Sequence, residues 1–142
     1  MKKIIAILFI LTIFLSLTAC DFSKIEISVE EGIMHIEHSD KLPKVNLLVF
    51  EGQIPVENPI FFEKLVSCIE GKNGEEMFCS ASCENIYVVE IGKYDFALHK
   101  DHILIYTPLG HNIKGVSITQ VECTEEEINE LVVLLDEAKF NN

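Results

Sequence analysis

The chain contains no arginine: all eleven of its basic residues are lysines, against 23 acidic residues, and its formal net charge is −12. The planar guanidinium of arginine is the side chain best suited to hold a phosphate group through two hydrogen bonds. An acidic chain without arginine is therefore poorly suited to nucleic acid or to an anionic lipid surface. The same charge suits a cationic protein or peptide as partner, and it also keeps a small domain soluble.

The sequence also lacks the short motifs that carry common catalytic chemistry. It has no glycine-rich phosphate loop, no Gly-x-Ser-x-Gly elbow and no His-Glu-x-x-His zinc motif. The histidine pairs His35/His38 and His99/His102 are spaced three apart, and on a strand such residues point to opposite faces. The segment from His99 to His102 is expected to form a turn and the edge of a strand. The loop 110–112 (Gly-His-Asn) is the nearest candidate for a polar functional loop. We therefore predict no catalytic residues, no metal site and no cofactor.

Long apolar runs are scarce, and the longest, Ile4–Leu17, is interrupted by Thr12 and Ser16. At about 1.5 Å per residue a helix of that length spans roughly 21 Å, which is short of the ~30 Å hydrocarbon core of a membrane. Two lysines, Lys2-Lys3, precede the run, and small residues and a cysteine follow it. This pattern is typical of a secretory signal peptide, with an uncleaved membrane anchor as the alternative.

The residues Leu17-Thr18-Ala19-Cys20 resemble the lipobox of bacterial lipoproteins, in which leucine lies three residues before the lipidated cysteine. The resemblance implies that residues 1–19 are cleaved and that the Cys20 sulfur carries diacylglycerol. It also implies acylation of the new amine, commonly with palmitate. Asp21 resembles the residue that retains enterobacterial lipoproteins in the inner membrane, which implies its periplasmic face in a Gram-negative cell. Two or three acyl chains make a stable anchor, whereas one chain binds only marginally.

Cleavage divides the chain into a signal peptide, a short lipidated N-terminus (20–23) and a single extracytoplasmic domain (24–142). Removing 19 of the 142 residues leaves 123, which is enough for one domain with its own core. Loss of the two signal lysines takes the net charge from −12 to −14. The mature protein is therefore expected to be small, strongly acidic and attached at its N-terminus.

Four cysteines remain after Cys20 is lipidated: Cys68, Cys79, Cys83 and Cys123. An even number of cysteines in an oxidising compartment predicts disulfides. Four cysteines allow three pairings, and the sequence does not choose among them. The preferred arrangement bridges the Cys79–Cys83 loop to both Cys68 and Cys123, because it ties the middle of the chain to its end. Zinc binding and thiol redox chemistry are less favoured, since three small residues separate Cys79 from Cys83.

The apolar pattern predicts an α+β domain in which an antiparallel sheet of short strands packs against a C-terminal helix. Alternation of apolar and polar residues predicts a hairpin close to the lipid, with strands over 24–29 and 33–38. It also predicts a third strand over 45–50 and, in the C-terminal half, four strands joined by short connections, over 86–91, 94–98, 102–107 and 116–122. Asn58-Pro59 begins a predicted helix that ends near Gly71, with an apolar strand as the alternative. Residues 72–76 are expected to form a polar loop. Thr124 and Glu127 form a capping box for the C-terminal helix.

These features predict a lipid-anchored protein of the bacterial envelope that acts through protein binding, without catalysis, as a structural or envelope-maintenance factor. In general character the chain also resembles periplasmic immunity lipoproteins: it is small and acidic, carries a lipobox, and begins with a hairpin at 24–38. That resemblance implies the alternative function of neutralising a secreted antibacterial toxin. In both cases the expected partners are the membrane, through Cys20, and a protein, with a cationic one favoured by the acidic charge, and no nucleic acid.

Overall fold

The computed structural model describes residues 24–78, 84–109 and 115–142. The described chain begins with a hairpin of β1 (Ile25–Glu30) and β2 (Ile33–His38), which pair antiparallel as a separate two-stranded sheet. Glu31 and Gly32 connect the strands with φ of 53° and 83°. Two positive φ values in a two-residue connection are those that a tight hairpin turn requires. The predicted hairpin is therefore confirmed, and its turn matches the twist of its strands.

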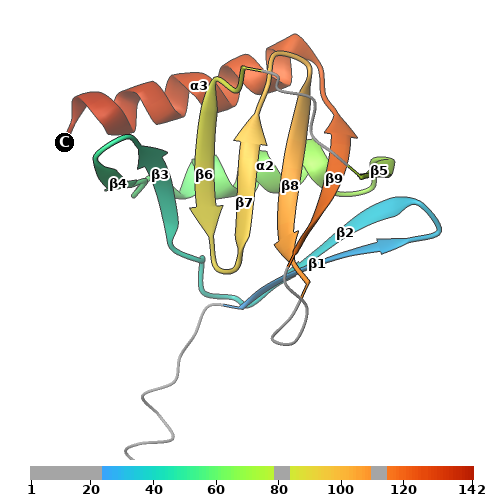
Figure 1. Ribbon diagram of the computed structural model, residues 1–142. Coiled ribbons are helices and arrows are strands. Elements are labelled where there is room, and N and C mark those ends of the chain that lie inside the picture. The colour runs from blue at the N-terminus through green and yellow to red at the C-terminus, as the bar shows by residue number, and fades with distance from the viewer. Residues whose placement is uncertain (1–23, 79–83, 110–114) are drawn as a thin grey trace, which may run out of the picture.

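The main sheet has seven strands in the order β4-β3-β6-β7-β8-β9-β5, and all neighbours pair antiparallel (Figure 1). The four strands β6 to β9 form the meander that short connections predict. The strands are β3 (Val45–Val49), β4 (Gly52–Pro55), β5 (Gly74–Met77), β6 (Tyr87–Ile91), β7 (Tyr94–Leu98), β8 (His102–Pro108) and β9 (Val116–Glu122).

Two helices, α2 (Pro59–Ile69) and α3 (Glu125–Phe140), lie behind the sheet in Figure 1 and contact each other. The Asn58 side chain caps α2 by accepting a hydrogen bond from the Ile60 N–H. Thr124 and Glu127 form the predicted capping box of α3, and three glutamates complement its N-terminal dipole. Both helices turn apolar side chains toward the same face of the sheet, where they form one core: Phe61, Phe62, Leu65, Ile69, Ile128, Leu131 and Leu135. The antiparallel sheet and the C-terminal helix are thus present, as the sequence predicts.

Two edge strands, β4 and β5, were not predicted, and the expectation of a loop at 72–76 is wrong. The segment Gly74–Met77 (Gly-Glu-Glu-Met) has no alternating apolar pattern, yet it pairs in register with β9. Its start is also held to the first hairpin, because the Gly74 N–H donates to the Gly32 carbonyl at 2.8 Å. Charged residues on an edge strand discourage further strand pairing.

Gly74 lies where β5, β9 and the first hairpin meet, and it leaves no room for a side chain. A Cβ there would lie 2.3 Å from Sδ of the buried Met34 and 3.1 Å from a Thr119 methyl. We expect Gly74→Ala to lower the free energy of unfolding by about 1–3 kcal/mol, because overpacking forces neighbours off their rotamers. Urea unfolding measures the change. Glu75→Ala, on the exposed next residue, is the control and is expected to stay within about 0.5 kcal/mol of wild type; equal losses would contradict the packing argument.

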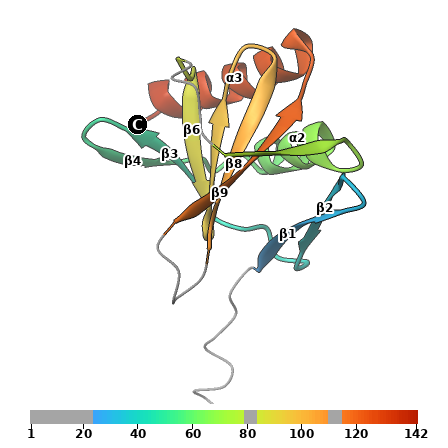
Figure 2. The same ribbon diagram turned by 45° about the vertical axis from the view of Figure 1, so that its right-hand side comes forward.

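The first hairpin lies on the helix side of the main sheet, below α2 in Figure 2, and polar contacts hold it there. The Ile27 N–H donates to Tyr94 Oη at 3.0 Å, and the Lys93 ammonium bonds Glu26 at 2.8 Å. At the other strand, the Ile36 N–H donates to the Glu70 carboxylate at 2.6 Å, just past α2. The start of the described chain is therefore fixed beside the β6–β7 turn.

Candidate interaction surface

In the described part of the chain, one face of the main sheet is covered by neither α2 nor α3; we call it the helix-free face. Along each strand alternate residues belong to the core, as do Leu47, Val89 and Phe96, while the residues between them point the other way. The register aligns these outward residues in two cross-strand rows. The first is Leu48, Val88, Ala97, Leu104, Gln120 and Glu75, and the second is Asn46, Glu90, Asp95, Tyr106, Ile118 and Met77.

Two carboxylates, Glu90 and Asp95, lie directly opposite each other on this face, on either side of the β6–β7 turn. Like charges opposite each other in a sheet are destabilising. Burial raises the pKa of the Asp95 carboxyl above its ordinary value, and the Glu90 carboxylate adds to that rise. The Gln53 and Asn46 amides approach one Glu90 oxygen at 3.3 and 3.5 Å. The outward positions of the described strands of this face include no lysine that would neutralise the pair.

Apolar side chains surround the acidic pair. Leu48, Val88, Tyr106 and Ile118 are partly buried, and the small Ala97 between them is 2 % exposed. Leu104 is only 4 % exposed, although it lies outside the helix-covered core. Such a surface can accept the ammonium or guanidinium of a partner at the acidic pair. Its apolar surroundings would strengthen that contact by excluding water.

The sequence did not single out Glu90 and Asp95, although it contained the signal for them. Gly92-Lys93 joins two predicted strands, so residues placed equally on either side of that turn must pair. Counting outward from the turn gives Ile91 with Tyr94 and then Glu90 with Asp95. Which face that pair occupies depends on how the helices pack, and local pattern does not reveal it.

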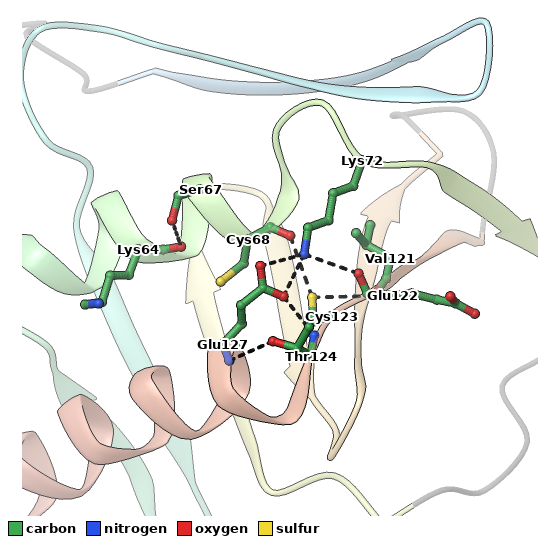
Figure 3. Close-up of polar contacts among 9 residues, drawn as sticks. All are labelled: Lys64, Ser67, Cys68, Lys72, Val121, Glu122, Cys123, Thr124 and Glu127. Atoms are coloured by element: carbon green, nitrogen blue, oxygen red, sulfur yellow. Dashed lines mark hydrogen bonds and ion pairs between the residues drawn. The ribbon is translucent and has the colours of Figure 1, made fainter.

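A second cluster lies where α2 ends and α3 begins (Figure 3). The Lys72 ammonium bonds the Glu127 carboxylate at 2.7 Å, and Glu127 in turn accepts from the Thr124 N–H at 2.8 Å. The hydrogen bond from Lys72 holds the pKa of Glu127 below its ordinary value. This ion pair joins the end of α2 to the cap of α3.

Cys68 and Cys123 lie beside this cluster, and both are buried free thiols in the structure. The Cys123 Sγ approaches the carbonyl oxygens of Cys68 and Val121 at 3.6 and 3.7 Å. Burial raises the pKa of the Cys123 thiol to about 12 and raises that of Cys68 as well. Thiols of this kind are poor nucleophiles and poor metal ligands at neutral pH. The expected disulfide staple is not observed among the described cysteines, and the Cys123 sulfur instead lies beside the backbone of Cys68.

Polar grooves adjoin the same region on the β9 side. A shallow groove of about 500 Å³ is lined by Lys72, Asn73, Glu75, Gln120 and Glu122. A second hollow of about 240 Å³ shares Gln120 and Glu122 with it and reaches Asp101 and His102. Both are open and carry more acidic than basic side chains, so they extend the acidic character of this side of the molecule.

The histidine pairs differ in their surroundings. His35 bonds Glu70 at 3.3 Å, while His38 packs edge-on against Phe62. His99 and His102 lie at the turn between β7 and the first residue of β8, as expected, and their rings stack with centroids 4.4 Å apart. Burial, and then His102, lower the pKa of His99. Among the described residues no three His, Cys, Asp or Glu side chains group to hold a metal ion.

Several predicted residues lie outside the described ranges: the lipidation site Cys20, the sorting residue Asp21, the disulfide candidates Cys79 and Cys83, and the loop 110–112. Within those ranges no helix is long and apolar enough to cross a membrane.

Comparison with known proteins gives no matching family model, no matching curated protein and no matching solved structure. The functional argument therefore rests on the residues of this chain.

Proposed function

We propose that this chain is a lipid-anchored, extracytoplasmic envelope protein that acts by binding a cationic protein on its helix-free face. The observation that carries the proposal is the acidic pair Glu90 and Asp95, opposite each other on a partly apolar sheet face. A lysine or arginine placed between them would relieve their repulsion and would lower the raised pKa of Asp95. Charge complementarity of this kind speeds association and selects against acidic partners.

The anchor would hold this face close to the membrane. Lys24 comes four positions after Cys20, so the tether between them reaches at most about 14 Å. The contact between Glu26 and Lys93 places the start of the fold beside the β6–β7 turn, which Glu90 and Asp95 flank. The acidic pair would therefore lie in the part of the sheet nearest the lipid. A resident membrane protein or an assembly intermediate fits this position, which supports the envelope-maintenance role.

The same acidic face also suits a basic secreted toxin, so the immunity role is the alternative. The two roles differ in the partner: an immunity protein holds one basic toxin tightly, whereas an envelope factor contacts resident membrane proteins. Either role places the cysteines in an oxidising compartment, where a disulfide staple is expected.

Site-specific cross-linking in cells tests the proposed surface. A photo-reactive amino acid replaces Tyr106 on the helix-free face of the full-length chain, or, as the positional control, the exposed Val133 on α3. We expect a basic protein to cross-link from position 106 and not from position 133. A resident membrane protein would support envelope maintenance, and a secreted toxin would support immunity.

Neutralising the acidic pair provides the second half of the test. Glu90→Gln combined with Asp95→Asn is expected to weaken binding of the protein cross-linked from position 106 at least about tenfold, equivalent to about 1.4 kcal/mol. Glu126→Gln combined with Glu137→Gln removes the same charge from exposed positions of α3 and should leave that binding unchanged. Equal losses in both variants, or cross-linking from position 133 alone, would overturn the proposed surface.

A further inference from the structure

The two described cysteines come from distant parts of the chain and meet at one point of the core. Cys68 lies in the last turn of α2, and Cys123 lies between β9 and α3, 55 positions later. Both side chains are buried, and the Cys123 sulfur is 3.6 Å from the carbonyl oxygen of Cys68. Figure 3 shows both cysteines beside the Lys72–Glu127 ion pair, with the Cys68 sulfur turned away from that of Cys123.

We propose that Cys68 and Cys123 form a disulfide with each other in the exported protein. A carbonyl oxygen lies about 2.4 Å from its own Cα, so the Cys123 sulfur is within about 6 Å of the Cys68 Cα. A disulfide keeps its two Cα atoms about 4.4–6.8 Å apart, and a Cys123 sulfur placed beside the Cys68 backbone is compatible with that range. Rotation about the Cα–Cβ bond of Cys68 would turn its sulfur toward Cys123.

This pairing differs from the one that the sequence favours, which joins Cys68 and Cys123 separately to the Cys79–Cys83 loop. A bond between the two described cysteines leaves Cys79 and Cys83 as partners of each other. The proposal rests on the proposed export, because only an oxidising compartment supplies the second reactant.

The reaction is thiol–disulfide exchange with an extracytoplasmic protein disulfide as the oxidant. The thiolate of one cysteine attacks a sulfur of that disulfide and forms a mixed disulfide. The second thiolate then displaces the carrier, which leaves as a dithiol with the two electrons and, by way of solvent, the two protons of the cysteine thiols. Burial disfavours both thiolates in the folded chain, so the exchange is expected before α2 packs onto the sheet.

Peptide mapping tests the pairing directly, because the lysines of this chain separate the alternatives. The full-length protein is isolated from membranes with N-ethylmaleimide present at lysis, and is then denatured and digested with trypsin without reduction. Cleavage after lysine places Cys68 in peptide 65–72, Cys79 and Cys83 together in 73–93, and Cys123 in 115–139. We expect 65–72 linked to 115–139, with 73–93 separate and lighter than its dithiol form by two hydrogen atoms.

The other outcomes are equally distinct. Linkage of all three peptides would mean bridges through Cys79 and Cys83, and it would overturn the pairing. Single substitutions add a check: Cys68→Ser should free the thiol of Cys123 alone, and Cys123→Ser that of Cys68 alone.

Refolding the reduced, denatured full-length chain in a glutathione redox buffer separates failure of the pairing from failure of the export. If the cellular protein is fully alkylated yet refolding links 65–72 to 115–139, the pairing stands and the export is wrong. If Cys68 and Cys123 stay alkylatable after refolding as well, the pairing is overturned whatever the compartment.

Discussion

Replacing Cys20 with alanine is expected to abolish the incorporation of radiolabelled palmitate and to leave the chain at its precursor length. The reason is chemical: the Cys20 sulfur is the proposed attachment point, and signal cleavage in lipoproteins follows lipidation. Two acyl chains of ordinary length would contribute more than about 20 kcal/mol of membrane affinity, at about 0.8 kcal/mol for each buried CH₂. No other single substitution in this chain is expected to change its membrane attachment as much.

Cys79→Ala is the matched control, because it also removes one cysteine that lies outside the described residues. It should retain the label and the mature length. The mass of the wild-type N-terminal peptide provides an independent measurement, since the proposal requires the mature chain to begin at Cys20. Label that persists in the Cys20 variant, or a wild-type chain that begins at Met1, would contradict the lipoprotein assignment.

The local elements of the fold could be predicted because their signals are local. Alternating residues in the hairpin and in β6 to β9, the Asn58-Pro59 start of α2 and the capping box at Thr124 each depend on neighbours in sequence. The edge strands β4 and β5 were missed because their positions are set by partners. One contains a proline and the other two consecutive glutamates, and each is held by pairing with a strand that has a stronger pattern.

The arrangement of the sheet could not be predicted in the same way. β3 lies beside β6, and β9 beside β5, although the paired strands are far apart in sequence. These pairings decide which face α2 and α3 cover, and therefore which carboxylates remain on the helix-free face. They also bring Cys68 to Cys123. The acidic pair and the cysteine pair are thus products of tertiary packing, which explains why composition indicated a cationic partner without locating its surface.

Tyr94 is the residue whose loss should reveal how firmly the first hairpin is attached. It is 1 % exposed, packs near Phe96 with ring centroids 6.5 Å apart, and is among the largest fully buried side chains of the described fold. Its hydroxyl accepts from the Ile27 N–H at 3.0 Å and donates to Glu26 at 3.2 Å. We expect Tyr94→Ala to lower the free energy of unfolding by about 3–5 kcal/mol, measured by urea unfolding of the full-length chain.

Tyr94→Phe separates the two contributions, because it keeps the ring in the core and removes only the hydroxyl. The Ile27 N–H then loses its partner, so we expect a smaller loss of about 1–3 kcal/mol. Hydrogen exchange should locate the effect: amides of β1 should exchange faster in the phenylalanine variant, while those of β8 stay protected. If phenylalanine is as damaging as alanine, the hydroxyl contributes more than the ring. If β1 exchange is unchanged, the hairpin is held by its contacts with Glu70 and Lys72 instead, and the link from the anchor to the acidic face does not run through Tyr94.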